Sequence, residues 1–324
     1  MLYPLLKSYV KFGLNWYVTE WQIKNLEFVD QKNPALIVSN HPNSFFDALV
    51  IAVHSPAEIL FLARGDAFKK PIANWALRTF FMLPIYKRND DEQADIMNAF
   101  TMDECVKELS KGNKILIFPE GVSRNQLTLQ PFMFKGMTML IERAIQRDIP
   151  LQIQPYALGY SSFDEVPKAV SIEGMSPIDS TNYLSGPNQV ETEKIMMDLR
   201  EKLEFNLTGE FLTPSQTKQQ KDWMKIPAQI GYYTHNWFYQ LVKKQIKKKT
   251  EGSIFYDSLL FGVLLFGYPI LIFLLSIILG NIFNFTTGFL FFILMPVFSY
   301  CWVNYSPIKK QEYGPEGRGN AFRK

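Results

Sequence analysis

The sequence predicts a layered α/β domain, with helices flanking a mixed sheet, followed by a membrane-spanning helical hairpin. Between residues 25 and 205, short apolar runs alternate with amphipathic helical stretches, an order typical of layered α/β domains. Residues 258–307 contain no charged side chain, and two apolar stretches there each approach the ~20 helical residues that cross a bilayer. The 324 residues provide for one large domain or two small ones.

Composition and charge exclude several classes of protein. The net charge of +3 is too small to indicate nucleic-acid binding, so we expect no nucleic-acid partner. The two cysteines, Cys105 and Cys301, lie far apart and offer neither a disulfide framework nor a metal-binding spacing, which fits a reducing compartment. The N-terminus lacks the long apolar core and the small-residue cleavage site of a signal peptide.

The chain opens with an amphipathic segment, residues 1–24. Leucines and aromatic side chains alternate there with Lys7 and Lys11, a pattern typical of a helix lying in a membrane interface. A helix packed on the core of its own domain has the same pattern, and the sequence leaves both possibilities open. We expect a strand over residues 25–30 and a turn over residues 31–34.

The polar stretch 40–47, Asn-His-Pro-Asn-Ser-Phe-Phe-Asp, is the centre of the predicted domain. It joins the apolar run 35–38, which predicts a buried strand, to the apolar run 48–53, which predicts a helix. Histidine suits proton transfer near neutral pH, and a carboxylate on its other ring nitrogen fixes its tautomer. His41 and Asp47 are therefore a candidate catalytic pair, and a polar turn with no chemistry is the alternative.

A second polar stretch, 118–124, follows another expected buried strand. Its sequence is Phe-Pro-Glu-Gly-Val-Ser-Arg, and the apolar run Ile115-Leu116-Ile117 precedes it. Strands and helices alternate around the two stretches. Expected strands are 59–63, 83–88, 114–118, 151–160 and 170–174, and expected helices are 72–80, 92–110, 135–146 and 190–205.

Together the two polar stretches resemble the glycerolipid acyltransferase family, which includes the lysophosphatidate and glycerol-3-phosphate acyltransferases. That family carries a His-x4-Asp motif and a downstream Phe-Pro-Glu-Gly motif, and the resemblance covers about residues 30–180. Two departures are visible in this chain. Five residues separate His41 from Asp47 instead of four, and the arginine after the Glu-Gly pair falls one place later than usual, at Arg124.

The resemblance implies a layered acyltransferase domain and a role for each matching residue. His41 and Asp47 take the catalytic positions of the family. Residues at the positions that the family uses for the acceptor phosphate are Arg88, Lys87, Glu120, Gly121, Arg124 and Lys135. The Pro-containing strand 151–160 corresponds to the family's last block, near the acyl chain.

The sequence pattern of the second half of the chain predicts association with a membrane. We expect an acyltransferase domain over residues 25–225, a basic aromatic interfacial helix over 226–250, a transmembrane hairpin over 254–305 and a tail over 306–324. Lysines flank both ends of the hairpin, so the positive-inside rule places the domain and the tail on the cytoplasmic face of a multi-pass membrane protein. Because every motif lies before residue 180, we also expect a chain truncated before residue 253 to fold.

The expected activity is transfer of a fatty acyl group to a hydroxyl of glycerol 3-phosphate or its 1-acyl form. The co-substrate is acyl-CoA or acyl carrier protein, with no bound cofactor, and the other partner is membrane lipid. Two alternatives remain: a metal-dependent hydrolase using His41, Asp47 and Glu120, and a membrane lipid-binding protein with an inactive site. The acyl donor, its chain length, the choice of acceptor and the oligomeric state are left open.

Overall fold

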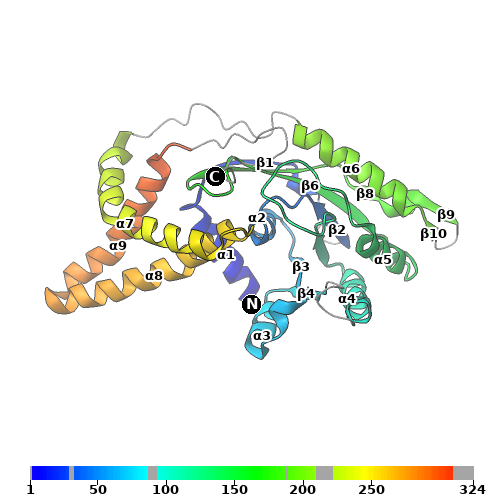
Figure 1. Ribbon diagram of the computed structural model, residues 1–324, viewed down its shortest axis with the longest axis horizontal. Coiled ribbons are helices and arrows are strands. Elements are labelled where there is room, and N and C mark those ends of the chain that lie inside the picture. Colours follow the sequence, from blue (N-terminus) through cyan, green and yellow to red (C-terminus); the bar gives the residue numbers. More distant parts are fainter. Residues whose placement is uncertain (1, 29–32, 87–92, 187–188, 209–221, 309–324) are drawn as a thin grey trace.

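A mixed sheet forms the centre of the computed structural model, which describes residues 2–28, 33–86, 93–186, 189–208 and 222–308 (Figure 1). Its strands are β1 Val18–Lys24, β2 Ala35–Ser39, β3 Ile59–Arg64, β4 Met82–Ile85, β5 Lys114–Ile117, β6 Gln152–Tyr160, β7 Lys168–Gly174 and β8 Ile178–Asp179. The order is β1-β7-β6-β2-β5-β3-β4, with β8 also on β6. The pairs β6–β7 and β6–β8 are antiparallel and the rest are parallel, which confirms the predicted mixed sheet.

Helices cover both faces of this sheet. They are α1 Leu2–Leu14, α2 Phe45–His54, α3 Pro71–Thr79, α4 Ala94–Leu109, α5 Phe134–Ile145, α6 Thr192–Thr208, α7 Lys225–Lys249, α8 Tyr256–Ile282 and α9 Phe285–Tyr305. A small ladder of β9 Leu184–Gly186 and β10 Gln189–Val190 lies beside the main sheet. One core lies between the sheet and α1, α2 and the start of α8, and the other lies under α4, α5 and α6.

Strand β2 sits in the middle of the sheet and is buried along its whole length. Successive side chains of a strand point to opposite faces, so Ile37 enters the first core while Leu36 and Val38 enter the second. β2 runs parallel to both of its neighbours, β5 and β6. The carboxyl ends of β2 and β5 therefore lie at one edge of the sheet, and the two polar stretches of the sequence begin there.

The N-terminal segment differs from the prediction in two ways. Helix α1 ends at Leu14, and residues 18–24 form strand β1 rather than the end of a helix. The strand expected over 25–30 is wrong, because residues 26–28 form a short 3-10 helix. β1 lies at the edge of the sheet and is only half-buried, so its apolar residues are too few to mark it in the sequence.

Helix α1 packs on the first core, with Tyr3, Val10 and Leu14 buried. The opposite face of the helix exposes Leu5 and Phe12. The structure thus shows the packed arrangement that the sequence left as one possibility, and it also leaves apolar side chains on the outside.

Helices α8 and α9 form an antiparallel hairpin that is long and apolar enough to cross a membrane. The Asn284 side chain caps α9 by accepting the Thr287 N–H at 2.9 Å. The two helices approach closely at Gly288, where an added Cβ would lie 2.4 Å from the Ser276 carbonyl oxygen. Only 17% of the most apolar stretch of each helix is buried, unlike a core helix in a soluble protein.

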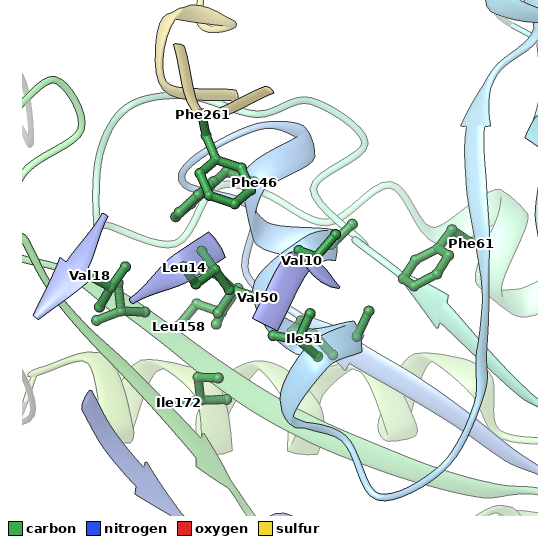
Figure 2. Close-up of a cluster of buried hydrophobic side chains, with 14 of the residues drawn as sticks. Val10, Leu14, Val18, Phe46, Val50, Ile51, Phe61, Leu158, Ile172 and Phe261 are labelled. Atoms are coloured by element: carbon green, nitrogen blue, oxygen red, sulfur yellow. The ribbon is translucent and has the colours of Figure 1, made fainter. Parts of the chain in front are cut away.

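The start of α8 belongs to the core of the α/β domain. Leu260 and Phe261 are buried in the first core, and Figure 2 shows Phe261 beside Phe46 of α2. The two rings meet edge to face, with centroids 5.4 Å apart. The expectation that a chain truncated before residue 253 folds is therefore not supported, since the truncation removes part of the domain's own core.

Candidate active site

The first polar stretch begins where β2 ends, and Asn40 fixes its direction. The Asn40 side-chain amide donates to the Leu158 carbonyl oxygen at 2.9 Å and accepts the Leu158 N–H at 2.7 Å. This pair of hydrogen bonds continues the β2–β6 ladder for one more position with a side chain in place of backbone. The next residue, His41, is thereby held at the edge of the sheet.

His41 and Asp47 come together across the turn. The distance from His41 Nδ1 to Asp47 Oδ2 is 2.9 Å. The Asp47 side chain is fully buried and that of His41 is 18% exposed. Ser44, between them, has a φ of 54°, and this left-handed residue lets the turn hold five residues before Asp47 enters the first turn of α2.

Two further donors hold the Asp47 carboxylate. The Tyr160 hydroxyl donates to Oδ1 at 2.7 Å and the Asn43 backbone N–H donates to Oδ2 at 2.7 Å. Burial raises the pKa of Asp47, and the hydrogen bonds from His41, Tyr160 and Asn43 act in the opposite direction. Burial and the nearby Asp47 raise the pKa of Tyr160 well above its ordinary value, so its hydroxyl keeps the proton that it donates.

These contacts define the state of the His41 ring. An ionised carboxylate only accepts hydrogen bonds, so Nδ1 carries the proton and Nε2 is the basic nitrogen. Nε2 makes no hydrogen bond to any residue that the structure describes. The ring stacks on Phe118, with centroids 3.9 Å apart and an interplanar angle of 8°. The ring is thus oriented by Asp47 at one edge and by Phe118 on one face.

Glu120 organises the backbone of the site. Its carboxylate accepts the His41 N–H at 2.7 Å and the Gln130 N–H at 3.0 Å. Burial raises the pKa of Glu120, and the two N–H donors act against this rise. Because both oxygens are occupied by backbone donors, Glu120 joins three loops of the site, and its predicted contact with an acceptor phosphate stays untested.

Gly121 completes a tight turn after Phe118. Its N–H donates to the Phe118 carbonyl oxygen at 3.1 Å, and its φ is 65°, in the left-handed region that favours glycine. A Cβ at this position would lie 2.1 Å from Met133 Sδ. The sequence pattern named Gly121, and the structure gives the steric reason for a glycine.

The predicted phosphate cations fall into three groups. Arg124 lies beside His41, since its N–H donates to the His41 carbonyl oxygen at 3.4 Å, and its exposed side chain has no ion-pair partner among the described residues. Lys135 forms an exposed ion pair with Asp95 of α4 at 3.1 Å. Lys87 and Arg88 lie outside the residues that the structure describes.

Ser123 joins the two polar stretches and was not singled out in the sequence. Its hydroxyl oxygen accepts the Ser44 N–H at 2.7 Å, and both residues are buried. The hydrogen bond fixes the turn that carries Asp47 to the loop that carries Glu120.

A buried charged cluster behind the turn was also missed. Lys168 of β7 and Asp257 of α8 form an ion pair of 2.6 Å, with side chains 0% and 1% exposed. The other Asp257 contacts are the Asn43 side-chain amide, which donates to Oδ2 at 2.6 Å, and the Tyr17 hydroxyl, which donates to Oδ1 at 2.5 Å. The Phe46 N–H donates to the Ser258 hydroxyl at 3.0 Å. The first turn of α8 is therefore hydrogen-bonded to the catalytic turn.

Asp47 and Glu120 are poor metal ligands in this arrangement. Each carboxylate oxygen accepts at least one hydrogen bond from the protein, and Asp47 is fully buried. In the part of the chain that the structure describes, no three His, Cys, Asp or Glu side chains cluster closely enough to hold a metal ion. The geometry favours acid–base chemistry by His41 over metal-assisted hydrolysis.

Residues 20–158 match the Acyltransferase family. The chain carries an acyltransferase domain. The match confirms the resemblance to the glycerolipid acyltransferases, and it contains His41, Asp47 and the second polar stretch through Arg124. The acyltransferase domain begins within β1, which is consistent with the place of that strand in the main sheet.

Curated relatives of this acyltransferase domain act on lysolipids by name. A lyso-ornithine lipid O-acyltransferase of Pseudomonas aeruginosa is 28% identical over 138 residues, 43% of this chain and 47% of that protein. The chloroplastic 1-acyl-sn-glycerol-3-phosphate acyltransferase BAT2 of Brassica napus is 25% identical over 40% of this chain and 36% of its own length. The chain thus spans less than half the length of each of these relatives.

A solved structure is also similar to the chain. It is the 1-acyl-sn-glycerophosphate acyltransferase PlsC of Thermotoga maritima, which is 18% identical and has a TM-score of 0.45. The similarity covers 62% of this chain and 78% of that one.

Proposed function

We propose that this protein is an O-acyltransferase of phospholipid synthesis, with His41 as general base. The observation that carries the proposal is the 2.9 Å contact between His41 Nδ1 and the buried Asp47, which leaves Nε2 as the basic nitrogen within an acyltransferase domain. The acceptor is glycerol 3-phosphate or its 1-acyl form, and the donor is acyl-CoA or acyl carrier protein. No cofactor is needed for this chemistry.

The proposed reaction uses the unprotonated Nε2 of His41 as the base. His41 Nε2 takes the proton of the acceptor hydroxyl as its oxygen attacks the thioester carbonyl carbon. The tetrahedral intermediate collapses, the carbon–sulfur bond breaks, and the thiolate leaves as the new ester forms. The imidazolium returns its proton to the thiolate, and Asp47 stabilises the imidazolium while it exists. The products are an ester and a free thiol, so atoms and charge balance.

The acceptor's phosphate requires cations near His41. Arg124 is exposed beside His41, and a guanidinium fork meets a phosphate with two hydrogen bonds. Lys87 and Arg88 are proposed for the same phosphate from the sequence alone. Lys135 is proposed as a more distant contributor, because its ion pair with Asp95 is exposed and exchanges readily with other anions.

We also propose that α8 and α9 cross the membrane and that the domain lies on the cytoplasmic face. Support comes from their length, their apolar exposed faces and the lysines that end α7 and follow α9. The lipid acceptor and the long-chain donor both partition to such a surface. The aromatic and basic helix α7 is proposed to lie at the interface.

The test is an assay of the purified full chain in detergent. Glycerol 3-phosphate, 1-acylglycerol 3-phosphate and a lyso-ornithine lipid are offered in parallel, each with acyl-CoA and with acyl carrier protein. We expect transfer to one of the glycerol phosphates and loss of roughly 10²–10⁴ in rate for His41→Ala. Asp47→Asn is expected to lose nearly as much, since the two residues act as a unit.

Three results would contradict parts of this proposal. Wild-type turnover no greater than that of His41→Ala would support an inactive, lipid-binding site. Transfer only to the lyso-ornithine lipid would move the acceptor away from glycerol phosphates. Near-normal turnover of Asp47→Asn would show that another group orients His41.

A further inference from the structure

A cavity of about 360 Å³ lies between α1, α7, α8 and α9, away from the residues already described as catalytic. This volume falls within the ~300–1,000 Å³ of cavities that hold small ligands. Its wall is almost entirely aromatic and aliphatic, with side chains that include Tyr9, Phe12, Phe238, Leu264, Ile272 and Phe292. Two helix-interior prolines, Pro269 of α8 and Pro296 of α9, also face it.

The few polar groups of the wall bind one another. His235 Nε2 lies 2.9 Å from the Tyr268 hydroxyl, which lies 3.3 Å from the Ser299 hydroxyl. Trp16 Nε1 donates to the same Ser299 oxygen at 3.0 Å. Because these groups are satisfied within the protein, the wall presents hydrocarbon, and such a cavity does not hold ordered water.

Tyr239 and Lys243 of α7 offer no polar anchor in this cavity. The Tyr239 ring lines the wall, but its hydroxyl has almost no accessible surface. Lys243, one turn further along α7, forms an ion pair with Glu165 at 3.1 Å. The wall therefore offers an occupant almost only apolar contacts.

The position of the cavity identifies its occupant. The cavity is partly open, and the helices that form two of its walls are the ones proposed to cross the membrane. Outward side chains of these helices, such as Phe273 and Leu290, are exposed and apolar. The surrounding phase is then the hydrocarbon of lipid tails, which matches the aromatic and aliphatic wall of the cavity.

The cavity is separate from the reacting atoms. None of its lining residues belongs to 40–47 or 118–124. Tyr17 and Phe261 stand in between, and they contact Asp257 and Phe46 on the catalytic side. A chain in the cavity does not reach His41, but it supports the two side chains against which the catalytic turn packs.

We propose that this cavity holds an acyl chain of a membrane phospholipid, as a resident lipid that does not react. The chain is held by apolar contacts with the aromatic and aliphatic wall, and its headgroup stays outside the cavity. The inference rests on the proposed membrane insertion of α8 and α9, and it adds a binding site to the proposed acyltransferase.

The test uses the full chain in nanodiscs that contain phosphatidylglycerol with a diazirine in one acyl chain. After irradiation, the labelled residues are mapped by mass spectrometry. We expect labels on cavity residues such as Phe238 as well as on outward positions of α8 and α9. Leu264→Trp fills the cavity and should lose the cavity labels while keeping the outward ones. Ile270→Trp places the same side chain on the exposed face of α8 and should keep both.

A second variant distinguishes loss of lipid binding from loss of the fold. Val303→Phe narrows the same cavity with a smaller side chain than tryptophan, so cavity labelling should fall while the thermal unfolding profile is retained. Cavity labels that persist in both Leu264→Trp and Val303→Phe, or that are absent from the wild type, would overturn the proposal. Displacement of the labels by excess lysophosphatidate or acyl thioester would show a substrate chain, which also overturns it.

The labelling of the cavity does not depend on acyl transfer by the enzyme. His41→Ala, expected to be inactive, should be labelled like the wild type. An absence of acyl transfer with normal cavity labelling would reject the proposed function alone. Normal acyl transfer without cavity labelling would reject the resident lipid alone.

Discussion

Asp257→Ala tests the buried cluster that joins α8 to the catalytic turn. The substitution leaves the fully buried Lys168 ammonium without its counter-charge, which costs about 3–5 kcal/mol in a buried pair. The Asn43 amide and the Tyr17 hydroxyl lose the same acceptor, so their losses overlap with this cost rather than adding to it. We therefore expect a fall of about 3–5 kcal/mol in the free energy of unfolding.

The pH dependence gives this prediction a second readout. Burial lowers the pKa of Lys168, while Asp257, Asp164 and Glu165 raise it. Removing Asp257 lowers the folded-state pKa further below the unfolded value of about 10.4. Between these two values the unfolded chain binds more protons than the folded one, so stability rises with pH. Asp257→Ala should therefore gain stability with rising pH more steeply than the wild type does.

The assay is thermal unfolding in detergent, followed by near-UV circular dichroism across pH 6–10. Lys194→Met is the matched control, because its pair with Glu191 is exposed at 3.7 Å and such pairs contribute about 0–1 kcal/mol. The double variant Lys168→Met/Asp257→Leu should recover much of the loss. Equal stability of Asp257→Ala and Lys194→Met, or equal pH slopes in Asp257→Ala and wild type, would refute the reasoning.

Four further predictions concern the domain and its site. Tyr160→Phe removes one donor from buried Asp47 and should lower both stability, by about 1.5–3 kcal/mol, and kcat, with KM unchanged; a raised KM alone would contradict this. Gly121→Ala forces a Cβ into a left-handed residue and should cost about 1–2 kcal/mol, whereas Gly136→Ala, which meets nothing within 4 Å, should cost nothing. Arg124→Ala should raise the acceptor KM by roughly tenfold to a hundredfold in steady-state kinetics and leave the donor KM unchanged. A chain ending at residue 252 should fail to unfold cooperatively, since it lacks Phe261 and Asp257; a sharp transition would show that the core is complete without them.

The sheet and the candidate catalytic pair follow from local patterns in the sequence. β2 is central and entirely buried, so its apolar run is continuous and its ends are clear. The polar stretch directly after it then has to lie at the sheet edge, which is why His41 and Asp47 could be named from the sequence. β1 could not be found in the same way, because an edge strand is half-buried and its partner β7 lies far along the chain.

The supporting residues of the site could not be predicted, for a different physical reason. Tyr160 contacts Asp47 across 113 positions, and Asn43 contacts Asp257 across 214. Contacts of this kind depend on how the sheet and the helices pack together, and no local pattern in the sequence predicts them. One signal was available: Asp257 is the last charged residue before the uncharged stretch, at the start of an otherwise apolar helix. A carboxylate at that place requires a partner, and Lys168 supplies it.

The hydrogen bond from Asn43 to Asp257 also fixes the distance between the turn that carries His41 and the start of the apolar helix α8. Asp257 lies in the first turn of α8, where the apolar span begins, and Asn43 is two residues from His41. An enzyme tied to its membrane by a flexible linker samples a range of heights above the lipid. In the proposed membrane arrangement, this hydrogen bond holds the proposed base His41 at a single height, close to the start of the span. The proposed lipid acceptor would then have to raise its hydroxyl to that fixed level, and the length of its headgroup would become a criterion for selection.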